Sequence, residues 1–351
     1  MGELFIEHRD PLFGIIILIL LIAVIFLVTY FWNLRAQRRR EQSLKKFSQL
    51  FDHSSVDKDA KALFERGADF GATLGFLAET YSKAGEYDKA IKIYLAMLEQ
   101  TQESGEKLLL LESLGETYFK AGFLERAKKI FLEVLKNAPR NPKALFWLMQ
   151  ACENLGQFDE ALEALDCLLE LGEKSERVKF NHAYLSAKRV LADPFLPLES
   201  KREELLELLQ NEPRLFRVVL GHLKSFELPL FWKKIVGSDY SLEVMDWLWN
   251  IPWESIPFDI ISKDKNLMDI YRAKGYVKDA EACEKFELEV LRVMNLHSSK
   301  KADLSFEYRC HACKSLFPVE FERCPSCGEL LSGSLILKIR KSRNETNLSF
   351  L

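Results

Sequence analysis

Four cysteines near the carboxyl end have the number and spacing of a metal site. Cys310 and Cys313 form one C-x2-C pair, ten residues follow, and Cys324 and Cys327 form a second pair. Two such pairs in a short segment are typical of tetrahedral thiolate sites, in which the backbone amides of each tight turn bond the sulfurs. Because four sulfur ligands leave no position for a substrate water, we expect a structural metal, either one Zn²⁺ or iron of the rubredoxin type.

The residues around these cysteines agree with two tight turns. Gly328 provides a flexible position after the second pair, and Lys314 stands at the matching position after the first. His311 lies inside the first turn, so we expect its ring to point away from the metal. Two disulfides are the alternative, but they require an oxidising compartment. A segment as short as 300–340 cannot fold on an apolar core, so the metal should supply much of its folding energy.

Side chains outside this group do not suggest catalysis. The sequence contains no H-E-x-x-H, G-x-S-x-G, G-x-x-x-x-G-K-[ST] or G-x-G-x-x-G motif, and its six histidines are scattered. The net charge is −3, and acidic residues offset the basic ones around the four cysteines, which argues against nucleic acid as a partner. Cys152, Cys167 and Cys283 fall in helical segments, where we predict small buried hydrophobic side chains. We therefore predict a protein that is not an enzyme, with no catalytic and no cofactor-binding residues.

Three columns of residues recur with a period close to 34. Each column is spaced by 37 and then by 34 residues, and the columns hold Tyr81, Tyr118, Cys152; Gly85, Gly122, Gly156; and Ala90, Ala127, Ala161. Leucines three residues apart precede each glycine, which predicts an amphipathic helix there. The glycine permits the positive φ of a helix C-cap, and the alanine lets a second helix approach the first. The pattern resembles the tetratricopeptide repeat, whose helical hairpins must stack on neighbours to cover their apolar faces.

We therefore predict an all-α solenoid over most of the chain. Tetratricopeptide repeats occupy residues 61–172, and degenerate helical repeats occupy residues 173–298. A fourth copy of the repeat pattern is marked by Leu267, Tyr271, Gly275 and Ala280.

The stretch from 195 to 262 departs from the repeat pattern. It contains several prolines and four of the six tryptophans, which are Trp232, Trp247, Trp249 and Trp253. One interpretation is an aromatic surface that binds a partner. The other is an irregular all-α core, which we favour because aromatic side chains are usually buried.

A strongly apolar segment near the amino end predicts a transmembrane helix over residues 12–32. Leu, Ile, Val or Phe fill 16 of the 20 positions from Leu12 to Phe31. Twenty helical residues span about 30 Å, the thickness of a bilayer core. A cleaved signal peptide is the alternative, but the first ten residues carry three acidic residues against one arginine, and the apolar run ends without a small-residue cleavage site.

The charges that flank this segment predict its orientation. Basic residues dominate the predicted linker at 33–60, where Glu41 is the only acidic residue from Arg35 to Lys46. Positive flanks stay on the cytoplasmic side, so the short segment 1–11 should face outward and the rest of the chain should be cytosolic. A polar tail at 341–351 completes the predicted organisation.

An anchor, cytosolic repeats and a C-terminal pair of cysteine turns, in this order, resemble the lipopolysaccharide assembly protein B (LapB, YciM) family. Three local sequences are also similar to that family: Tyr308-Arg309-Cys310-x2-Cys313, Cys324-Pro325-Ser326-Cys327 and the segment 168–178. The resemblance covers most of residues 12–190 and 300–340, and it is weak between 195 and 262.

The resemblance implies a bacterial inner-membrane protein with a periplasmic N-terminus, a cytoplasmic bulk and a rubredoxin-like C-terminal domain. Its metal ligands would be the four cysteines Cys310, Cys313, Cys324 and Cys327. The implied function is that of an adaptor that regulates lipopolysaccharide synthesis. It would promote degradation of the lipid A deacetylase LpxC by the membrane protease FtsH. The alternative is a scaffold for another inner-membrane or envelope assembly pathway. The resemblance does not predict an oligomeric state.

Overall fold

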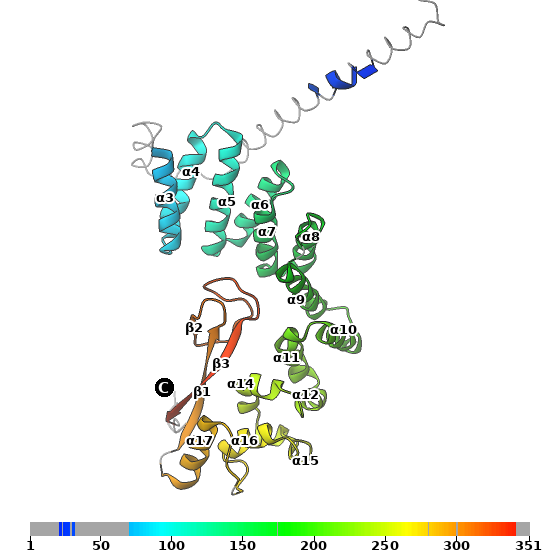
Figure 1. The fold of residues 1–351 in the computed structure, drawn as a ribbon, viewed down its shortest axis with the longest axis vertical. Coiled ribbons are helices and arrows are strands. Elements are labelled where there is room, and N and C mark those ends of the chain that lie inside the picture. The colour runs from blue at the N-terminus through cyan, green and yellow to red at the C-terminus, as the bar shows by residue number, and fades with distance from the viewer. Residues whose placement is uncertain are drawn as a thin grey trace, which may run out of the picture. The chain divides into compact units, whose positions relative to one another are not determined.

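The computed structural model describes residues 21–22, 24–28, 30–31, 70–173, 175–279, 281–299 and 301–341 (Figure 1). The predicted segments 1–11 and 33–60 lie outside these residues, as does the tail beyond 341. Only part of the predicted membrane span at 12–32 is described, and that part is helical with exposed side chains such as Phe26. None of the helices that the structure describes combines the length and the apolar character that crossing a membrane requires.

The chain divides into two compact units, residues 1–178 and 179–351. In the first unit each predicted repeat is a helical hairpin, and successive hairpins pack on each other. Its helices are α3 (Phe70–Lys83), α4 (Tyr87–Gln100), α5 (Ser104–Lys120), α6 (Leu124–Asn137), α7 (Pro142–Asn154) and α8 (Phe158–Glu170).

The glycine column forms the turn inside each hairpin, as predicted. Gly85, Gly122 and Gly156 have φ values of 81°, 83° and 74°. In the second hairpin the N–H of Phe123 donates to the carbonyl oxygen of Tyr118 at 2.9 Å, and the other two hairpins repeat this bond. A left-handed residue with this bonding is the Schellman ending of a helix, which glycine adopts without strain.

Small residues permit the close packing of the helices. Ala90, Ala127 and Ala161 are completely buried. A Cβ atom added to Gly115 would lie 2.8 Å from the ring of Phe131, so this position in α5 requires glycine.

The prediction for the three isolated cysteines was wrong in two respects, because Cys167 is not buried and Cys283 lies before α17 and not in a helix. Cys152 and Cys283 are buried, but Cys167 is exposed. Leu165 and Leu168 take the buried positions of α8 on either side of it. Cys167 therefore falls on the outer face of the helix, because successive residues are about 100° apart around the axis.

The second unit contains an irregular helical array. Its helices are α9 (Glu176–Ala192), whose first residues precede the division, then α10 (Leu198–Asn211), η2 (Pro213–Leu215), α11 (Phe216–Phe226), α12 (Leu228–Ile235), α13 (Tyr240–Glu243), α14 (Met245–Trp249), η3 (Trp253–Ser255), α15 (Phe258–Ile261), α16 (Lys265–Ala273) and α17 (Phe286–His297). Trp232 and Trp249 are buried in one apolar core, whereas Trp247 is half-buried and Trp253 is exposed. The tryptophan-rich stretch is thus mainly core, and only two indoles reach the surface.

The fourth copy of the repeat pattern is incomplete. Gly275 has a φ of 83°, and Tyr276 N–H donates to the carbonyl oxygen of Tyr271, as in the true repeats. The next helix begins only at Phe286, so α16 and α17 pack on each other across a longer connection than the tight turn of a true repeat. Ala280, predicted as part of this copy, lies outside the described residues.

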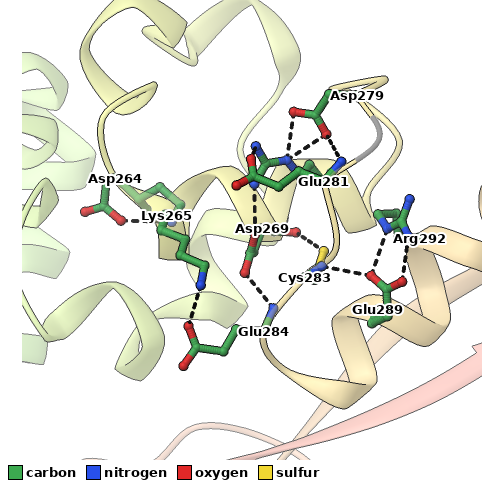
Figure 2. Close-up of polar contacts among 11 residues, drawn as sticks. Asp264, Lys265, Asp269, Asp279, Glu281, Cys283, Glu284, Glu289 and Arg292 are labelled. Atoms are coloured by element: carbon green, nitrogen blue, oxygen red, sulfur yellow. Dashed lines mark hydrogen bonds and ion pairs between the residues drawn. The ribbon is translucent and has the colours of Figure 1, made fainter.

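Polar contacts hold the segment between α16 and α17, and Figure 2 shows Asp269, Asp279, Glu281 and Glu284 among them. Arg272, 6% exposed, bonds Asp269 in its own helix at 3.0 Å and Asp279 in the segment at 2.8 Å, and it also pairs with Glu281. Asp269 in turn accepts a hydrogen bond from the backbone N–H of Glu284 at 2.9 Å. These charge pairs hold the non-helical connection, while apolar residues of α16 and α17 share one core.

All strands that the structure describes lie in the predicted metal segment, where they form a β-ribbon. The strands are β1 (Ala302–Cys310), β2 (Leu316–Phe317) and β3 (Gly333–Lys341), in the antiparallel order β2-β1-β3. The register of β1 and β3 runs without interruption from Ala302 opposite Lys341 to Cys310 opposite Gly333. Leu304 and Ala302 are buried in the helical core, which attaches the ribbon to the second unit.

Candidate metal centre and its attachment to the helices

The structure brings all four predicted cysteines together at one end of the ribbon. The sulfurs of Cys310 and Cys327 are 3.6 Å apart, those of Cys313 and Cys324 are 3.7 Å apart, and all four lie within 4.8 Å of one another. Four Zn–S bonds of about 2.3 Å in a tetrahedron separate the sulfurs by about 3.8 Å. The cluster therefore fits a tetrahedral metal, zinc or iron of the rubredoxin type.

The two cysteine pairs form equivalent backbone turns. The N–H of Lys314 donates to the carbonyl oxygen of Cys310 at 3.0 Å, and the N–H of Gly328 donates to that of Cys324 at 2.8 Å. Lys314 and Gly328 have φ values of 63° and 73°, so both are left-handed. Lysine pays a conformational penalty at a position that glycine tolerates freely. The hydrogen bonds of the first cysteine turn must therefore hold Lys314 in this conformation.

Hydrogen bonds favour the thiolate form of Cys310. Burial raises the pKa of this thiol, but donors from the Ser332 hydroxyl and from the amides of Cys313 and Ala312 outweigh it and lower the pKa to about 6. The Ser332 oxygen lies 3.2 Å from the sulfur. Since a metal binds thiolate rather than thiol, these donors favour metal binding through Cys310, whereas burial raises the pKa of Cys324 and Cys327.

His311 does not belong to the cluster. Among the described residues, the group able to hold a metal contains the four cysteines alone. The ring of His311 is exposed, and its backbone N–H donates to the carbonyl oxygen of Ser332 at 2.8 Å. That His311 does not bind the metal stays a prediction.

Residues just before the second cysteine pair attach the ribbon to the helices. Glu320 accepts from the guanidinium of Arg217 in α11 at 2.5 Å and from the indole N–H of Trp247 in α14 at 3.1 Å. Burial would lower the pKa of Arg217, but Glu320 and Asp246 raise it, so this arginine stays charged. The contact is a charge-assisted bond in a partly dry environment, stronger than a typical surface pair.

Two further residues of this segment bind α9. Glu322 accepts from the hydroxyl of Tyr184 at 2.7 Å and from the ammonium of Lys188 at 2.9 Å. Arg323 donates to the side-chain oxygen of Asn181 at 2.8 Å. Glu322 and Arg323 lie within two residues of Cys324, so the position of the metal turn and the contact with α9 depend on each other.

The first strand makes a similar contact next to the first cysteine pair. Tyr308, two residues before Cys310, donates its hydroxyl to Asp246 at 2.7 Å. Farther along the strand, the indole N–H of Trp249 donates to Asp303 at 2.9 Å. Sequence reasoning missed all of these docking residues, because partners 54 to 142 positions apart leave no local pattern.

The first unit has a separate concave feature between its hairpins. A cavity of about 400 Å³ is lined by α3 and α5 and by Lys143 at the start of α7. Its lysines pair with acids of the same wall, as in Lys83 with Glu79 at 2.7 Å and Lys120 with Glu116 at 2.8 Å. A groove with alternating charges suits a polar peptide better than an apolar ligand.

Comparisons with known proteins agree with the repeat architecture. The family model for the anaphase-promoting complex, cyclosome, subunit 3 matches residues 83–168, which is less than half of the chain. No curated protein matches the chain.

Several solved structures are similar to this chain at low sequence identity. A tetratricopeptide repeat protein from Parabacteroides merdae is 17% identical, with 74% of this chain and 99% of that chain covered and a TM-score of 0.38. The first TPR of Spaghetti (RPAP3), solved with the HSP90 peptide SRMEEVD, is 20% identical, with coverages of 36% and 97% and a TM-score of 0.32. MamA from AMB-1 is 18% identical, with coverages of 44% and 81% and a TM-score of 0.32.

The hairpins, their glycine turns and the family match define a tetratricopeptide-type repeat protein with a C-terminal four-cysteine cluster. Repeat proteins of this class are typically non-enzymatic scaffolds for protein–protein interaction, because stacked hairpins present an extended concave surface.

Proposed function

We propose that the chain is an inner-membrane adaptor that promotes FtsH-dependent degradation of LpxC and thereby regulates lipopolysaccharide synthesis. The observation that carries the proposal is the order of its parts. An apolar N-terminal segment precedes tetratricopeptide-type repeats, and a four-cysteine ribbon follows them. This order and the wording around the cysteines resemble the lipopolysaccharide assembly protein B family.

In this proposal the repeats bind the client and the N-terminal segment holds them at the bilayer, with the bulk of the chain in the cytoplasm. Confining an adaptor to the membrane raises the effective concentration of its client near a membrane protease, without any new contact. The groove between α3, α5 and α7 is the client surface that we favour, since its charged walls suit a peptide segment.

The bound metal would act indirectly. Tetrahedral zinc, or rubredoxin-type iron, would hold the two cysteine turns together and leave no position for catalysis. Glu320, Glu322 and Arg323 would then keep the ribbon against α9, α11 and α14. The ribbon supports the shape of the helical unit in this role.

The test is to deplete the protein in a Gram-negative host that encodes it and to measure LpxC abundance and half-life. We expect LpxC to accumulate, and re-expression of the wild-type chain should reverse the effect. A chain with Cys324→Ser and Cys327→Ser should fail to restore degradation, whereas Cys167→Ser, an exposed cysteine outside the cluster, should restore it. Unchanged LpxC on depletion would contradict the proposal and favour a scaffold for another envelope pathway.

A further inference from the structure

The second unit contains a larger cavity, of about 760 Å³, between its helices and the ribbon. Phe216 of α11 and Tyr240 of α13 form part of its wall as a stacked pair, with ring centroids 5.0 Å apart and planes at 8°. Both side chains are half-buried, so part of each ring is accessible from the cavity. The volume is within the range of pockets that hold a small ligand or a few side chains.

The cations in this wall are already neutralised. Arg217 is paired with Asp246 at 2.8 Å and with Glu320 at 2.5 Å. Arg214 binds both carboxylate oxygens of Glu212 at 2.6 Å. Neither arginine therefore offers a free positive charge to an anionic ligand.

Two acidic residues of the wall, in contrast, have no described partner that neutralises their charge. Asp239 and Glu243 flank Tyr240 in sequence, line the cavity and are exposed. Within the part of the chain that the structure describes, neither carboxylate has a hydrogen bond or an ion pair. The uncompensated charge of the cavity is negative.

A buried carboxylate behind the wall has spare acceptor capacity. Asp246 is 4% exposed, and its Oδ2 accepts from two lining residues, Arg217 and Tyr308. Its Oδ1 is buried and has no hydrogen-bond partner among the described residues. A buried carboxylate oxygen without a donor is costly, so a ligand donor or a water that reaches it would be stabilised.

We propose that this cavity binds the arginine or lysine side chains of a basic peptide segment in a partner protein. A cation gains from the faces of Phe216 and Tyr240 and from the carboxylates of Asp239 and Glu243. An acidic ligand would instead meet two uncompensated negative charges. This inference is independent of the adaptor function proposed above, because it concerns the second unit and not the groove of the repeats.

Fluorescence anisotropy of the purified full chain in mild detergent tests the proposal. The probe is a fluorescein-labelled Leu-Arg-Leu-Arg-Leu peptide, and the matched peptide carries glutamine in place of arginine. We expect the arginine peptide to bind at low salt and Asp239→Asn/Glu243→Gln to weaken it about tenfold. Tyr240→Leu should also weaken binding, because it removes the aromatic face. The matched control is Glu203→Gln/Glu207→Gln on the exposed face of α10, which changes the net charge equally but lies outside the cavity.

The outcomes separate a site from general charge attraction. Loss of affinity in the cavity variant, with the α10 variant close to wild type, supports the proposal. Equal losses in both variants would overturn it, since net charge would then account for binding. Equal affinity for the glutamine peptide, or a cavity variant that binds like wild type, would overturn it as well. None of these results depends on LpxC, so they test this proposal separately from the adaptor proposal.

Discussion

The hydroxyl of Tyr184 in α9 donates to Glu322 of the ribbon at 2.7 Å, across 138 residues of sequence. Glu322 lies two residues before Cys324, whose sulfur belongs to the metal cluster. Side chains just before each cysteine pair bind the helices, Tyr308 before the first and Glu322 before the second. Loss of the metal should therefore weaken the contacts with α9 and α14, because the docking residues lie within two positions of the cysteine ligands.

Metal loss should release the ribbon from the helices. We expect one metal per chain in wild type and less in Cys324→Ser, since three sulfurs no longer close the tetrahedron. Hydrogen exchange should then show lost protection in β1 and β3 and faster exchange in α9, while α5 and α6 keep their protection. The control Cys167→Ser should leave both the metal content and the exchange unchanged. Full protection of β3 without metal would contradict the expected coupling.

Glu322 should contribute to ribbon docking beyond a surface ion pair. Glu322→Gln loses the charge that pairs with Lys188 and weakens the bond from Tyr184, and we expect a loss of about 1–2 kcal/mol in the free energy of unfolding. Glu307→Gln is the control in the same ribbon, where the partner Lys338 is 53% exposed and the loss should stay below about 0.5 kcal/mol. Urea unfolding followed by ribbon-specific hydrogen exchange measures both. Equal effects would mean that Glu322 does not dock the ribbon.

Gly115 should not tolerate a methyl group. In Gly115→Ala the new Cβ would meet the Phe131 ring at 2.8 Å, and the repacking should cost about 1–3 kcal/mol despite the better helix propensity of alanine. Gly75→Ala is the matched change in α3, where the nearest atom is Met97 Cε at 3.6 Å. That variant should be neutral or more stable by up to about 1 kcal/mol. Thermal unfolding compares the stabilities of the two variants. A Gly115→Ala protein at least as stable as Gly75→Ala would show that the Phe131 ring moves aside.

Among the charged side chains around α16, Arg272 should cost the most stability when it is removed. Arg272→Met leaves Asp269, only 2% exposed, without its cation, and we expect a loss of about 3–5 kcal/mol. Lys265→Met removes an ion pair with Glu284 whose partners are 60% and 68% exposed, and it should cost less than about 0.5 kcal/mol. Chemical denaturation provides both values. Similar values for the two variants would show that the Arg272 network does not hold the segment before α17.

Glu289 should make stability depend on pH in the acidic range. The hydrogen bonds from Arg292 and from the backbone N–H of Cys283 lower the pKa of Glu289 to about 2 from an ordinary value of 4.5. A carboxyl with a lowered folded-state pKa adds stability above its unfolded value and loses it as the pH falls toward the folded value. The stability difference between wild type and Glu289→Gln should therefore be constant above pH 5 and shrink from pH 4.5 toward 2. Urea titrations at several pH values measure it, and a difference that grows on acidification would contradict the assignment.

Local chemistry explains which features could be predicted from the sequence. A glycine after an amphipathic helix predicted the left-handed turns at Gly85, Gly122 and Gly156, because only the nearest neighbours decide that conformation. The same reasoning failed after Gly275, where the turn forms but the second helix begins only at Phe286. There Arg272 and its acidic partners hold a non-helical segment, and no local pattern marks such a network.

By itself the sequence determined the repeat hairpins, the convergence of Cys310, Cys313, Cys324 and Cys327, and the separation of His311 from that cluster. These features follow from spacings of a few residues, which fix helix faces and tight turns directly. Only the tertiary structure decided that Glu322 meets Tyr184, and it alone placed Asp239 and Glu243 at a cavity beside Phe216. Contacts between distant segments depend on how whole elements pack, and side-chain type and spacing carry no information about that.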